Sequence, residues 1–423
     1  MNRAIAAIAL TCCATATIWA DGTNDPAPTL WTQANLVGDP GGWRSRLEAH
    51  GLTLNPVYTG EVMGESGGLC DGNRVISAHL LALPLDLDLE KLAGWPGAQL
   101  HANAFWIAGR GLTEDCIGDL ANVSNISAYR TARLNELWLQ QTFWNQTLSL
   151  KAGALAMDSE FFSSSASALF INSSFGTFSL FAANLPNPPI FPIAAPGIRV
   201  AVHAGSHWLF QMGVFDGDSL AQDVNKDGLA FHLAESDGAL ILSEAQFSPH
   251  ATVDDQTLGS VLKVGTFIHT KRIPTWDAQL QGDTTGGAMN YGFYGVIDQD
   301  IYKNNGRRIS LFLRGGAAPG NRNMIGWYVD TGCNFSGFLP GRPNDVAGVA
   351  FARSNFSRNF SHYGSVANGD DDRRAEMVIE TTYRAQLTPW WTLQPDFQVI
   401  LTPDGQRNAD TAVVAGLRTS VAF

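Results

Sequence analysis

The stretch Thr411–Phe423, TAVVAGLRTSVAF, decides the fold predicted for this chain. Its residues alternate between two sets: Val413, Ala415, Leu417, Thr419 and Val421 in one, and Val414, Gly416, Arg418, Ser420 and Ala422 in the other. A period of two predicts a β-strand whose two faces meet different surroundings. The chain stops on Phe423 directly after this strand, and such an ending is typical of bacterial outer-membrane barrels, in which aromatic girdles bound an outward apolar band.

The same alternation occurs in Glu376–Leu387 and in Trp390–Leu401. In both segments bulky apolar residues occupy one face, and charged, amide or hydroxyl residues occupy most of the other. In a soluble β-sandwich the polar face would meet water outside. In a membrane barrel the faces invert, so that lipid surrounds the outside and water fills the lumen. Periodicity alone does not separate these two interpretations.

The lengths of the connections favour the barrel. We expect about sixteen strands, an even number as in bacterial barrels. They start near residues 52, 75, 98, 134, 147, 197, 207, 239, 260, 289, 307, 324, 345, 374, 390 and 412. Short links and long loops largely alternate along the chain, which predicts one rim of tight turns and one rim of long loops. The prediction is an all-β, antiparallel transmembrane barrel over residues 52–423.

The composition agrees with a barrel and excludes some partners. Charged residues make up 16% of the 423 residues, below the roughly 25% of a typical soluble domain. The formal net charge of −12 argues against a nucleic-acid partner, because no basic patch is present to neutralise phosphates. After the leader, no segment has 18 uninterrupted apolar residues, so no transmembrane helix is expected. Only a closed barrel could then span a bilayer.

The N-terminal part precedes the barrel. Residues 1–20 have a basic start, an apolar stretch and a polar, Pro-containing continuation, which predicts a secretory signal peptide. Residues 21–51 are interpreted as a periplasmic segment with a short helix at Gly41–His50. Cys70, Cys116 and Cys333 then remain, and one disulfide with one free thiol is an option in an oxidising compartment. Their pairing stays open.

Long segments resemble one family, the bacterial carbohydrate-selective porins of the OprB type. They include NLVGDPGGWRSRLEAHGLTL (35–54), DLDLEKLAGWPGAQLHANAFWIAGRGL (86–112), DSEFFSSSASALFINSSFG (158–176) and YRAQLTPWWTLQPDFQVILTP (383–403). The resemblance runs from about Leu36 to Phe423, with a departure at Pro40, where the family pattern has Trp. It implies a sixteen-stranded outer-membrane barrel that admits sugars, glucose-like monosaccharides above all.

The resemblance also implies an eyelet, in which basic side chains and a carboxylate meet an inward-folded loop. Sugar hydroxyls need charged partners that replace water, and apolar sugar faces need flat aromatic surfaces. We expect Met157–Pro196, with its many Phe, Ser, Asn and Pro residues, to be the constricting loop. The expected eyelet residues are Arg110, Arg133, Glu136, Trp138, Glu160, Phe161, Asn172 and Arg199. The alternatives are a rim ion pair for Arg133 and Glu136, and a small loop core for the aromatic residues.

Further charged residues fall on the face of the strands that we assign to the lumen. These expected lumen-lining residues are Lys151, Arg314, Glu380, Arg384, Asp396 and Arg418. Charges of both signs on opposite walls would create a transverse field, and plain solvated lining is the alternative.

One segment resembles the start of a calcium loop. Asp223, Asn225 and Asp227 occupy positions 1, 3 and 5, and Gly228 occupies position 6. The residue at position 12 is Ala234 in place of the bidentate Glu of such loops. No firm metal site and no cofactor are therefore expected, and a solvated turn is the competing interpretation.

The function predicted is a passive outer-membrane channel for mono- and disaccharides, integral to the membrane and surrounded by its lipid, as a monomer or a homotrimer. No HExxH or GxSxG motif occurs, so we expect no enzymatic activity, and His101, His203 and His269 are interpreted as lumen or rim groups. The alternative is an outer-membrane or secreted β-protein that binds or hydrolyses glycans.

Overall fold

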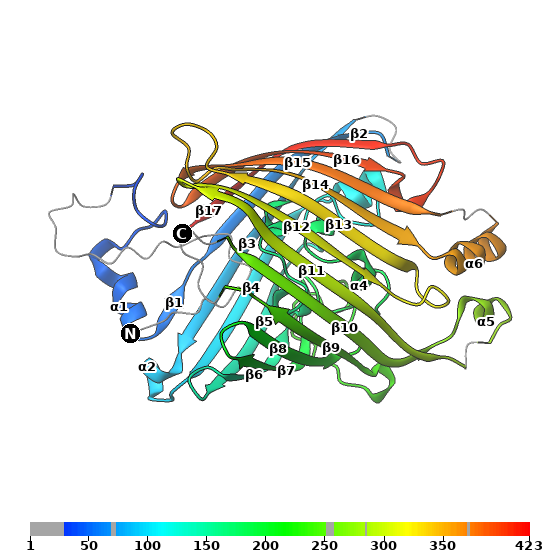
Figure 1. Cartoon of the computed structure of the whole chain (residues 1–423), viewed down its shortest axis with the longest axis horizontal. Coiled ribbons are helices and arrows are strands. Elements are labelled where there is room, and N and C mark those ends of the chain that lie inside the picture. Colours follow the sequence, from blue (N-terminus) through cyan, green and yellow to red (C-terminus); the bar gives the residue numbers. More distant parts are fainter. Residues whose placement is uncertain (1–28, 69–72, 251–257, 284–285, 370–372) are drawn as a thin grey trace.

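The computed structural model describes residues 29–68, 73–250, 258–283, 286–369 and 373–423. The predicted signal peptide, residues 1–20, lies outside this range. Seventeen strands form one antiparallel sheet, in which β17 pairs with β2 and β9 pairs with β10. Strands β2 to β17 therefore close into a ring of sixteen, and the short β1 is added to it through β3. The prediction of a sixteen-stranded barrel is confirmed (Figure 1).

The strands are β1 (Leu52–Leu54), β2 (Val57–Ser66), β3 (Arg74–Asp88), β4 (Ala98–Gly109), β5 (Thr131–Phe143), β6 (Leu148–Leu155), β7 (Ala195–Ala204), β8 (Trp208–Asp216), β9 (Ala239–Phe247), β10 (Ser260–Ile273), β11 (Ala288–Asn304), β12 (Arg307–Ala317), β13 (Ile325–Ser336), β14 (Val346–Phe356), β15 (Ala375–Thr388), β16 (Trp391–Leu401) and β17 (Ala412–Ala422). Fifteen of the sixteen predicted starts lie within three residues of the start of a strand of the closed ring, β2 to β17. The start predicted at residue 52 is wrong in detail, because β1 ends before Pro56, which has no N–H for a ladder, and the ring begins at Val57.

Short helices occupy the ends and loops. They are η1 (Pro40–Gly42), α1 (Trp43–Ala49), α2 (Leu89–Ala93), η2 (Thr113–Ile117), α3 (Met157–Glu160), η3 (Ser167–Leu169), η4 (Ser173–Phe175), α4 (Ser179–Ala182), η5 (Glu235–Asp237), α5 (Trp276–Leu280), α6 (Arg358–Asn368) and η6 (Pro403–Gly405). Within the described residues no helix is long and apolar enough to cross a membrane. Helix α1 falls inside the segment predicted as a short periplasmic helix.

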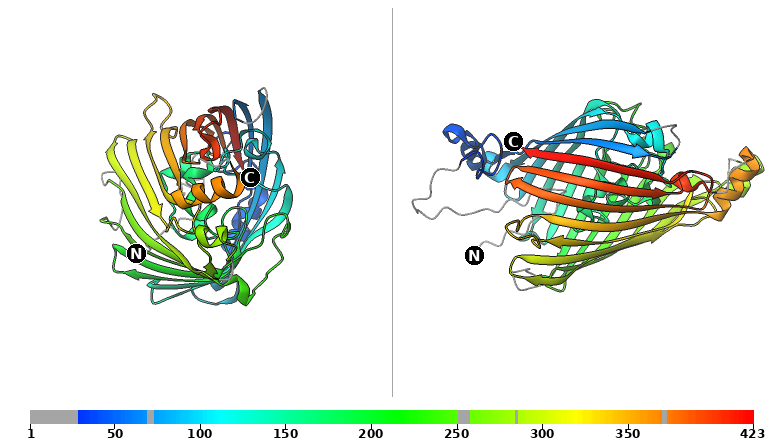
Figure 2. Two further views of the ribbon diagram at one scale, coloured as in Figure 1. Left: turned by 90° about the vertical axis from the view of Figure 1, so that its right-hand side faces the viewer. Right: turned by 90° about the horizontal axis from the view of Figure 1, so that it is seen from above.

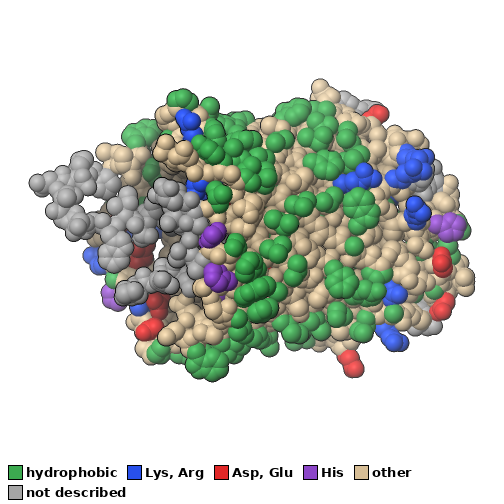
Figure 3. Space-filling model, viewed as in Figure 1, with side chains coloured by type: hydrophobic (Ala, Val, Ile, Leu, Met, Phe, Trp, Pro, Cys, Tyr) green, Lys and Arg blue, Asp and Glu red, His purple; other side chains and the backbone are tan. Residues whose placement is uncertain are grey.

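The two faces of the wall differ as the alternation requires. On β16 and β17, Phe397 and Leu417 point outward and are 47% and 44% exposed, whereas Asp396 and Arg418 point inward and are 6% and 9% exposed. Figure 3 shows the same division over a whole face, with hydrophobic side chains across the middle and charged side chains concentrated toward the two ends. The apolar face is therefore the outside of the barrel, as expected for a wall surrounded by lipid.

The two rims also differ. The short turns lie at the same end as α1 and Phe423, and the long loops with α5 and α6 lie at the other end (Figures 1 and 2). At the short-turn end, Arg44 of α1 donates from Nη2 to the carbonyl of Phe423 at 2.8 Å and from Nη1 to the carbonyl of Leu54 at 2.9 Å. The N–H of Phe423 donates to the carbonyl of Pro56. The N-terminal segment thus closes over the end of the last strand.

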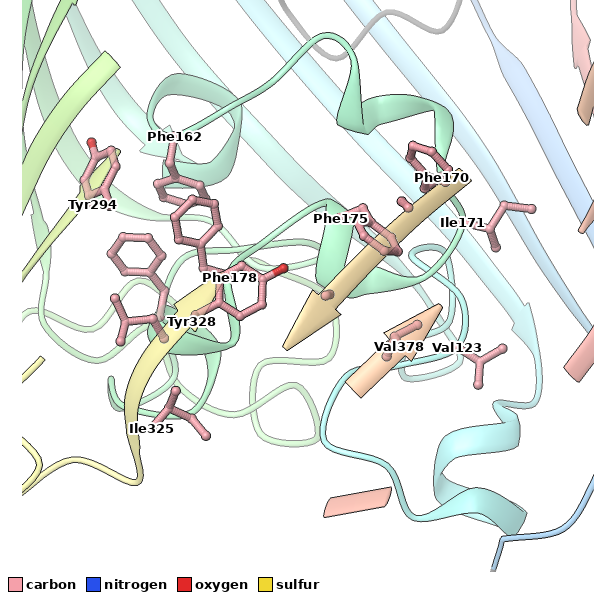
Figure 4. Packing of buried hydrophobic residues seen from close by; sticks show 14 of the residues in the cluster. Val123, Phe162, Phe170, Ile171, Phe175, Phe178, Tyr294, Ile325, Tyr328 and Val378 are labelled. Atoms are coloured by element: carbon pink, nitrogen blue, oxygen red, sulfur yellow. The ribbon is translucent and has the colours of Figure 1, made fainter. Parts of the chain in front are cut away.

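The hydrophobic core lies inside the barrel. The β6–β7 loop carries α3, η3, η4 and α4 into the interior, visible within the ring of strands in Figure 2. Six Phe side chains of this loop are at most 1% exposed: Phe161, Phe162, Phe170, Phe175, Phe178 and Phe181. They pack against one another and against wall residues such as Tyr294 and Tyr328 (Figure 4). The packing fixes the loop against many strands of the barrel wall.

Candidate functional site

Carboxylates of the inner wall hold the β6–β7 loop. Glu380 on β15 accepts hydrogen bonds from the N–H groups of Ile171 at 2.6 Å and Asn172 at 2.9 Å. Asp298 on β11 accepts from the N–H of Ser165 at 2.9 Å. The loop's helices are too short to satisfy their own N–H groups, so these wall oxygens replace the missing partners.

A buried ion pair holds the other end of the same segment. Arg314 on β12 donates from Nε to Asp330 Oδ1 at 3.0 Å. Its Nη1 and Nη2 donate to the carbonyls of Gly176 and Ser174, both at 3.0 Å. Both charged side chains are fully buried. A paired guanidinium therefore fastens two loop carbonyls to the wall, and removing one partner of such a pair typically costs about 3–5 kcal/mol.

Inward-facing glycines make room for the loop. A Cβ atom at Gly348 would lie 2.6 Å from Leu169 Cδ2 and 2.8 Å from Phe170 Cζ. A Cβ at Gly316 would lie 2.8 Å from Leu180 Cδ2. Real Cβ contacts are longer than this, so the loop's side chains occupy the volume that a larger wall residue would fill. The high glycine content of the chain is explained in part by this packing.

Three charged residues meet where α3 ends, and we call Lys151, Glu160 and Arg199 the constriction cluster. Lys151 on β6 and Arg199 on β7 are directly paired residues of neighbouring strands. Arg199 Nε donates to Glu160 Oε2 at 2.9 Å, and Lys151 Nζ donates to Glu160 Oε1. Their side chains are 8–10% exposed. The loop thus carries a carboxylate to two cations of the wall.

Aromatic rings lie beside this cluster. Lys151 Nζ lies 3.8 Å from the ring centroid of Trp138 on β5. The ring of His101 on β4 stacks on Trp138, with centroids 4.7 Å apart, and His101 Nδ1 lies 2.7 Å from Asp86 Oδ1. A flat aromatic surface and hydrogen-bonding groups therefore occur side by side, which is the combination that a sugar ring requires.

Two further polar side chains complete the site. Glu136 Oε1 accepts from the N–H of Ala156 at 3.0 Å and from Ser159 Oγ at 3.2 Å, so it fastens the start of the loop. Gln140 Oε1 accepts from Arg199 Nη2 at 3.0 Å. The charges of the site are held in fixed positions by hydrogen bonds at several points.

The pKa values of two loop carboxyl groups shift in opposite directions. Burial alone would raise the pKa of the Glu160 carboxyl, but the positive charges of Lys151 and Arg199 outweigh it, so this pKa lies below its ordinary value. Burial raises the pKa of the Asp158 carboxyl, against the opposing effect of hydrogen bonds from Phe191 and Thr177. Glu160 is therefore the loop carboxylate that stays ionised beside the wall cations.

The structure brings together four of the predicted eyelet residues: Glu136, Trp138, Glu160 and Arg199. It adds Lys151, which was predicted as lumen lining. Two predictions are corrected: the side chains of Phe161 and Asn172 have no exposed surface. The Phe161 ring packs on the Phe215 ring, and the Asn172 amide bonds Gln398 and Ser174, so both belong to the packing of the loop rather than to its pore-facing surface.

Two arginines of the predicted eyelet lie apart from the cluster. Arg110 pairs with Asp115 in the β4–β5 loop at 2.9 Å. Arg133 is 3% exposed, and the adjacent Leu134 donates its N–H to Asp227 of the β8–β9 loop. Among the described residues neither arginine contacts Glu160, and Arg133 makes no ion pair with Glu136. A β-bulge at residue 135 explains why residues 133 and 136 both point inward.

The residues predicted to line the lumen lie in different surroundings in the structure. Arg314 and Glu380 point inward, but the loop covers them, so they do not line open lumen. Arg418 bonds Glu61 and Asn125. Asp396 accepts from Gln398, and Arg384 is half-buried opposite Val346.

The segment considered for calcium forms turns. The Asn225 amide bonds the backbone of Ala230 in both directions, at 3.1 and 3.2 Å, and Asp227 accepts from the N–H of Leu229. Asp223 is exposed. In the described ranges no group of three or more His, Cys, Asp or Glu side chains is placed to hold a metal ion. Of the cysteines, Cys70 lies outside the described residues.

Sequence reasoning missed Asp86 and did not assign His101 to the site. These residues face each other on β3 and β4. The alternation of side chains along β3 and β4 predicts that both residues point inward. Only the pairing register of β3 with β4 across the turn at α2 places them beside Trp138. That register was the missing signal.

Comparisons with known proteins show which family the chain resembles. Residues 73–423 match the family model described as carbohydrate-selective porin, OprB family. The chain is 25% identical to Porin B of Pseudomonas aeruginosa, over 92% of this chain and 91% of the relative. It is also 25% identical to the putative porin QuiX of Acinetobacter baylyi, over 94% and 95%.

A solved structure shows the same fold. The high-pH structure of Pseudomonas putida OprB superposes with a TM-score of 0.84 at 23% identity, covering 93% of this chain and 99% of the other. The low-pH structure of the same protein gives a TM-score of 0.60 at 20% identity, with the same coverage.

Proposed function

The chain belongs to the OprB family of carbohydrate-selective porins and is an integral outer-membrane sugar channel, and we propose that the constriction cluster with Trp138 selects glucose-like monosaccharides for passive diffusion. The observation that carries this proposal is the contact of the cluster with an aromatic face, since Lys151 Nζ lies 3.8 Å from the Trp138 ring. Donors, acceptors and a flat apolar surface are offered at one level of the pore.

Charge balance supports a neutral solute. Lys151 and Arg199 carry two formal positive charges, and Glu160 and Glu136 carry two formal negative charges. Ions of either sign therefore gain little net attraction, while sugar hydroxyls find both donors and acceptors. The donors and acceptors of the site already form hydrogen bonds with one another. A sugar therefore replaces one set of hydrogen bonds with another and is not held tightly, so it is released again, as conduction requires.

We propose no catalytic step at this site. Glycoside hydrolysis commonly uses two carboxyl groups on either side of the scissile bond. Here the Glu136 carboxylate is bonded to the loop at Ala156, and the Glu160 carboxylate to Lys151 and Arg199. Incubation with a glycan panel tests this point, and release of reducing sugar would contradict it. The monomer and the homotrimer remain alternatives for the assembly.

The selection proposal is tested by sugar block of ion current in planar bilayers. Trp138→Leu removes the aromatic face, and the apparent affinity for glucose should fall roughly two- to twelve-fold, because an aromatic contact is worth about 0.5–1.5 kcal/mol. Trp106→Leu is the matched control, since Trp106 is also on a barrel strand but points outward and is 48% exposed. Equal glucose block in both variants would refute the assignment.

A further inference from the structure

Three arginines lie on the outer rim of the barrel at the end that carries the long loops, and we infer that they bind phosphate groups of an outer-leaflet glycolipid. We call Arg272 on β10, Arg322 in the β12–β13 loop and Arg353 on β14 the arginine belt. The inference depends on the outer-membrane location of the chain and not on the sugar selectivity proposed for the pore.

Arg353 points away from the lumen. It alternates along β14 with Ala352 and Ser354, which are 2% and 3% exposed toward the interior. Its direct neighbours across the sheet are Val329 and Met377. A charged side chain on the lipid-facing side of a barrel is unfavourable at depth and tolerated near an interface, where headgroups are within reach.

The guanidinium of Arg353 is positioned but not neutralised. It lies 5.3 Å from the centroid of the Trp327 ring, and its Nη1 lies 3.9 Å from Met377 Sδ. Its single oxygen partner is Asn355 Oδ1, at a long 3.5 Å, and its Nε is buried without a hydrogen-bond partner among the described residues. The side chain is thus fixed in place, and its two terminal nitrogens Nη1 and Nη2 have only long contacts, at 3.9 and 3.5 Å, that an oxygen-rich anion would improve on.

Arg272 and Arg322 meet at one residue of the neighbouring strand. Arg272 is exposed and pairs directly with Met289 of β11. Arg322 donates from Nη1 to the carbonyl of Met289 at 3.4 Å. Four strand spacings separate β10 from β14, so the belt spans about 20 Å at a spacing of about 4.8 Å.

No carboxylate of the described chain neutralises these cations. None of the three arginines forms an ion pair with a described residue. The outward positions of β10 to β15 contain no Asp or Glu, because the acidic residues of these strands, Asp298, Asp300, Asp330, Glu376 and Glu380, all point inward. Figure 3 shows Lys and Arg side chains, together with some Asp and Glu side chains, at the long-loop end of the drawn face, beside the hydrophobic surface. Charge complementarity therefore calls for an external anion.

The level of the arginine belt in the membrane indicates which class of anion it binds. Tyr291, Phe293 and Trp327 lie on the same outward face and are 46%, 63% and 39% exposed. Such aromatic girdles lie at the level of the lipid headgroups. The long loops of outer-membrane barrels face the cell exterior, so these headgroups belong to the outer leaflet. Planar guanidinium groups bind phosphate through paired hydrogen bonds, which makes a phosphorylated glycolipid the fitting partner.

The test uses the full-length barrel in detergent, titrated with bisphosphorylated lipid A, and counts retained lipid by native mass spectrometry. The triple variant Arg272→Gln, Arg322→Gln, Arg353→Gln should bind this lipid roughly tenfold or more weakly, because several charge-assisted hydrogen bonds are lost. Arg307→Gln is the matched control, since Arg307 also lies beside an aromatic ring, 5.9 Å from the centroid of Phe338, but at the short-turn end. Lipid A without phosphate should bind equally weakly to all variants.

Other outcomes would overturn the inference. Equal retention of the bisphosphorylated and phosphate-free lipids by the unchanged protein would exclude phosphate recognition. Unchanged lipid binding with a lowered oligomeric state in the triple variant would assign the belt to a contact between copies. If the triple variant does not fold, Arg272→Gln alone decides, because Arg272 is exposed, and unchanged affinity there would contradict the inference. Sugar block measured on the same variants should stay unchanged, which separates this test from that of the pore.

Discussion

Replacing Glu160 by Gln should convert the constriction from charge-balanced to anion-favouring. The carboxylate accepts from Arg199 Nε at 2.9 Å and from Lys151 Nζ. Gln keeps the shape of the side chain but removes the negative charge, so two cations then face the pore with the Glu136 carboxylate as the remaining counter-charge. The low pKa of Glu160, which Lys151 and Arg199 cause against the effect of burial, means that the unchanged protein carries this charge at neutral pH.

The size of the effect follows from Coulomb's law. A chloride ion passing about 7 Å from the removed charge would be relieved of about 0.6 kcal/mol of repulsion at a dielectric constant of about 80, and of about 2.4 kcal/mol at about 20. This range corresponds to roughly three- to fifty-fold in occupancy. The chloride-to-potassium permeability ratio should therefore rise at least about threefold.

Reversal potentials in planar bilayers under a salt gradient measure this ratio. Salt near 10 mM is preferred, because the Debye length is then about 30 Å and screening inside the pore is weak. Glu90→Gln removes an equal charge from the exposed periplasmic turn at α2 and serves as the control. Glu160→Asp keeps the charge and should keep the ratio. A folded, heat-resistant Glu160→Gln barrel with the ratio of the unchanged protein would refute the reasoning.

Three further predictions concern the loop, the rim and pH. Gly348→Val should displace the inward loop, because a Cβ atom at residue 348 would lie 2.6 Å from Leu169 Cδ2. The single-channel conductance should then rise. Gly64→Ala is the control and should leave the conductance unchanged, because a Cβ atom at residue 64 would have its nearest neighbour at 3.4 Å. Burial, and then the charge of Glu376, raises the pKa of Asp119 in the β4–β5 loop. The folded chain therefore favours the protonated form and loses stability as the pH rises from 3.8 through the raised pKa. Asp119→Asn should raise the unfolding temperature at neutral pH and not below pH 3.8; a gain of equal size at both would contradict the sign. Arg44→Ala removes hydrogen bonds to Phe423 and Leu54, which should lower the free energy that holds the N-terminal segment on the barrel by about 1–3 kcal/mol. Protease should then cleave this segment faster while the barrel stays resistant. An unchanged rate of cleavage would show that other contacts hold the segment.

The position of the core distinguishes this molecule from a soluble β-protein. Its buried apolar cluster joins the residues of one loop inside the ring to inward-facing wall residues such as Phe215, Phe267 and Phe312, while other apolar residues of the wall point outward. The inner wall also carries polar groups, and Glu380, Asp298 and Arg314 bind the loop in addition to this apolar packing. A charged wall and an aromatic loop are therefore compatible, because these three wall side chains bind backbone groups of the loop.

Much of the fold could be predicted from the chain itself. The two-residue period in Thr411–Phe423 and the sorting of short and long connections require a wall with two unlike faces and two unlike rims. The strand starts follow from turns at fixed places, and they were wrong in detail only where Pro56 interrupts the first strand. The family resemblance gave the sugar channel, and the match over residues 73–423 bears it out.

The site depended on tertiary structure. Sequence parity shows that Lys151, Trp138 and Arg199 point inward, but it does not show which residue of a long loop reaches them. The loop path is set by contacts between residues more than a hundred positions apart, such as Ile171 with Glu380 and Ser174 with Arg314. Those contacts bury Phe161 and Asn172 and bring Glu160 to the wall cations. The alternation of side chains is a local property of the backbone, so the two faces of the wall follow from the sequence alone. The position of the loop depends on contacts between residues that are distant in the sequence, so only the folded structure determines which loop residues meet the wall cations.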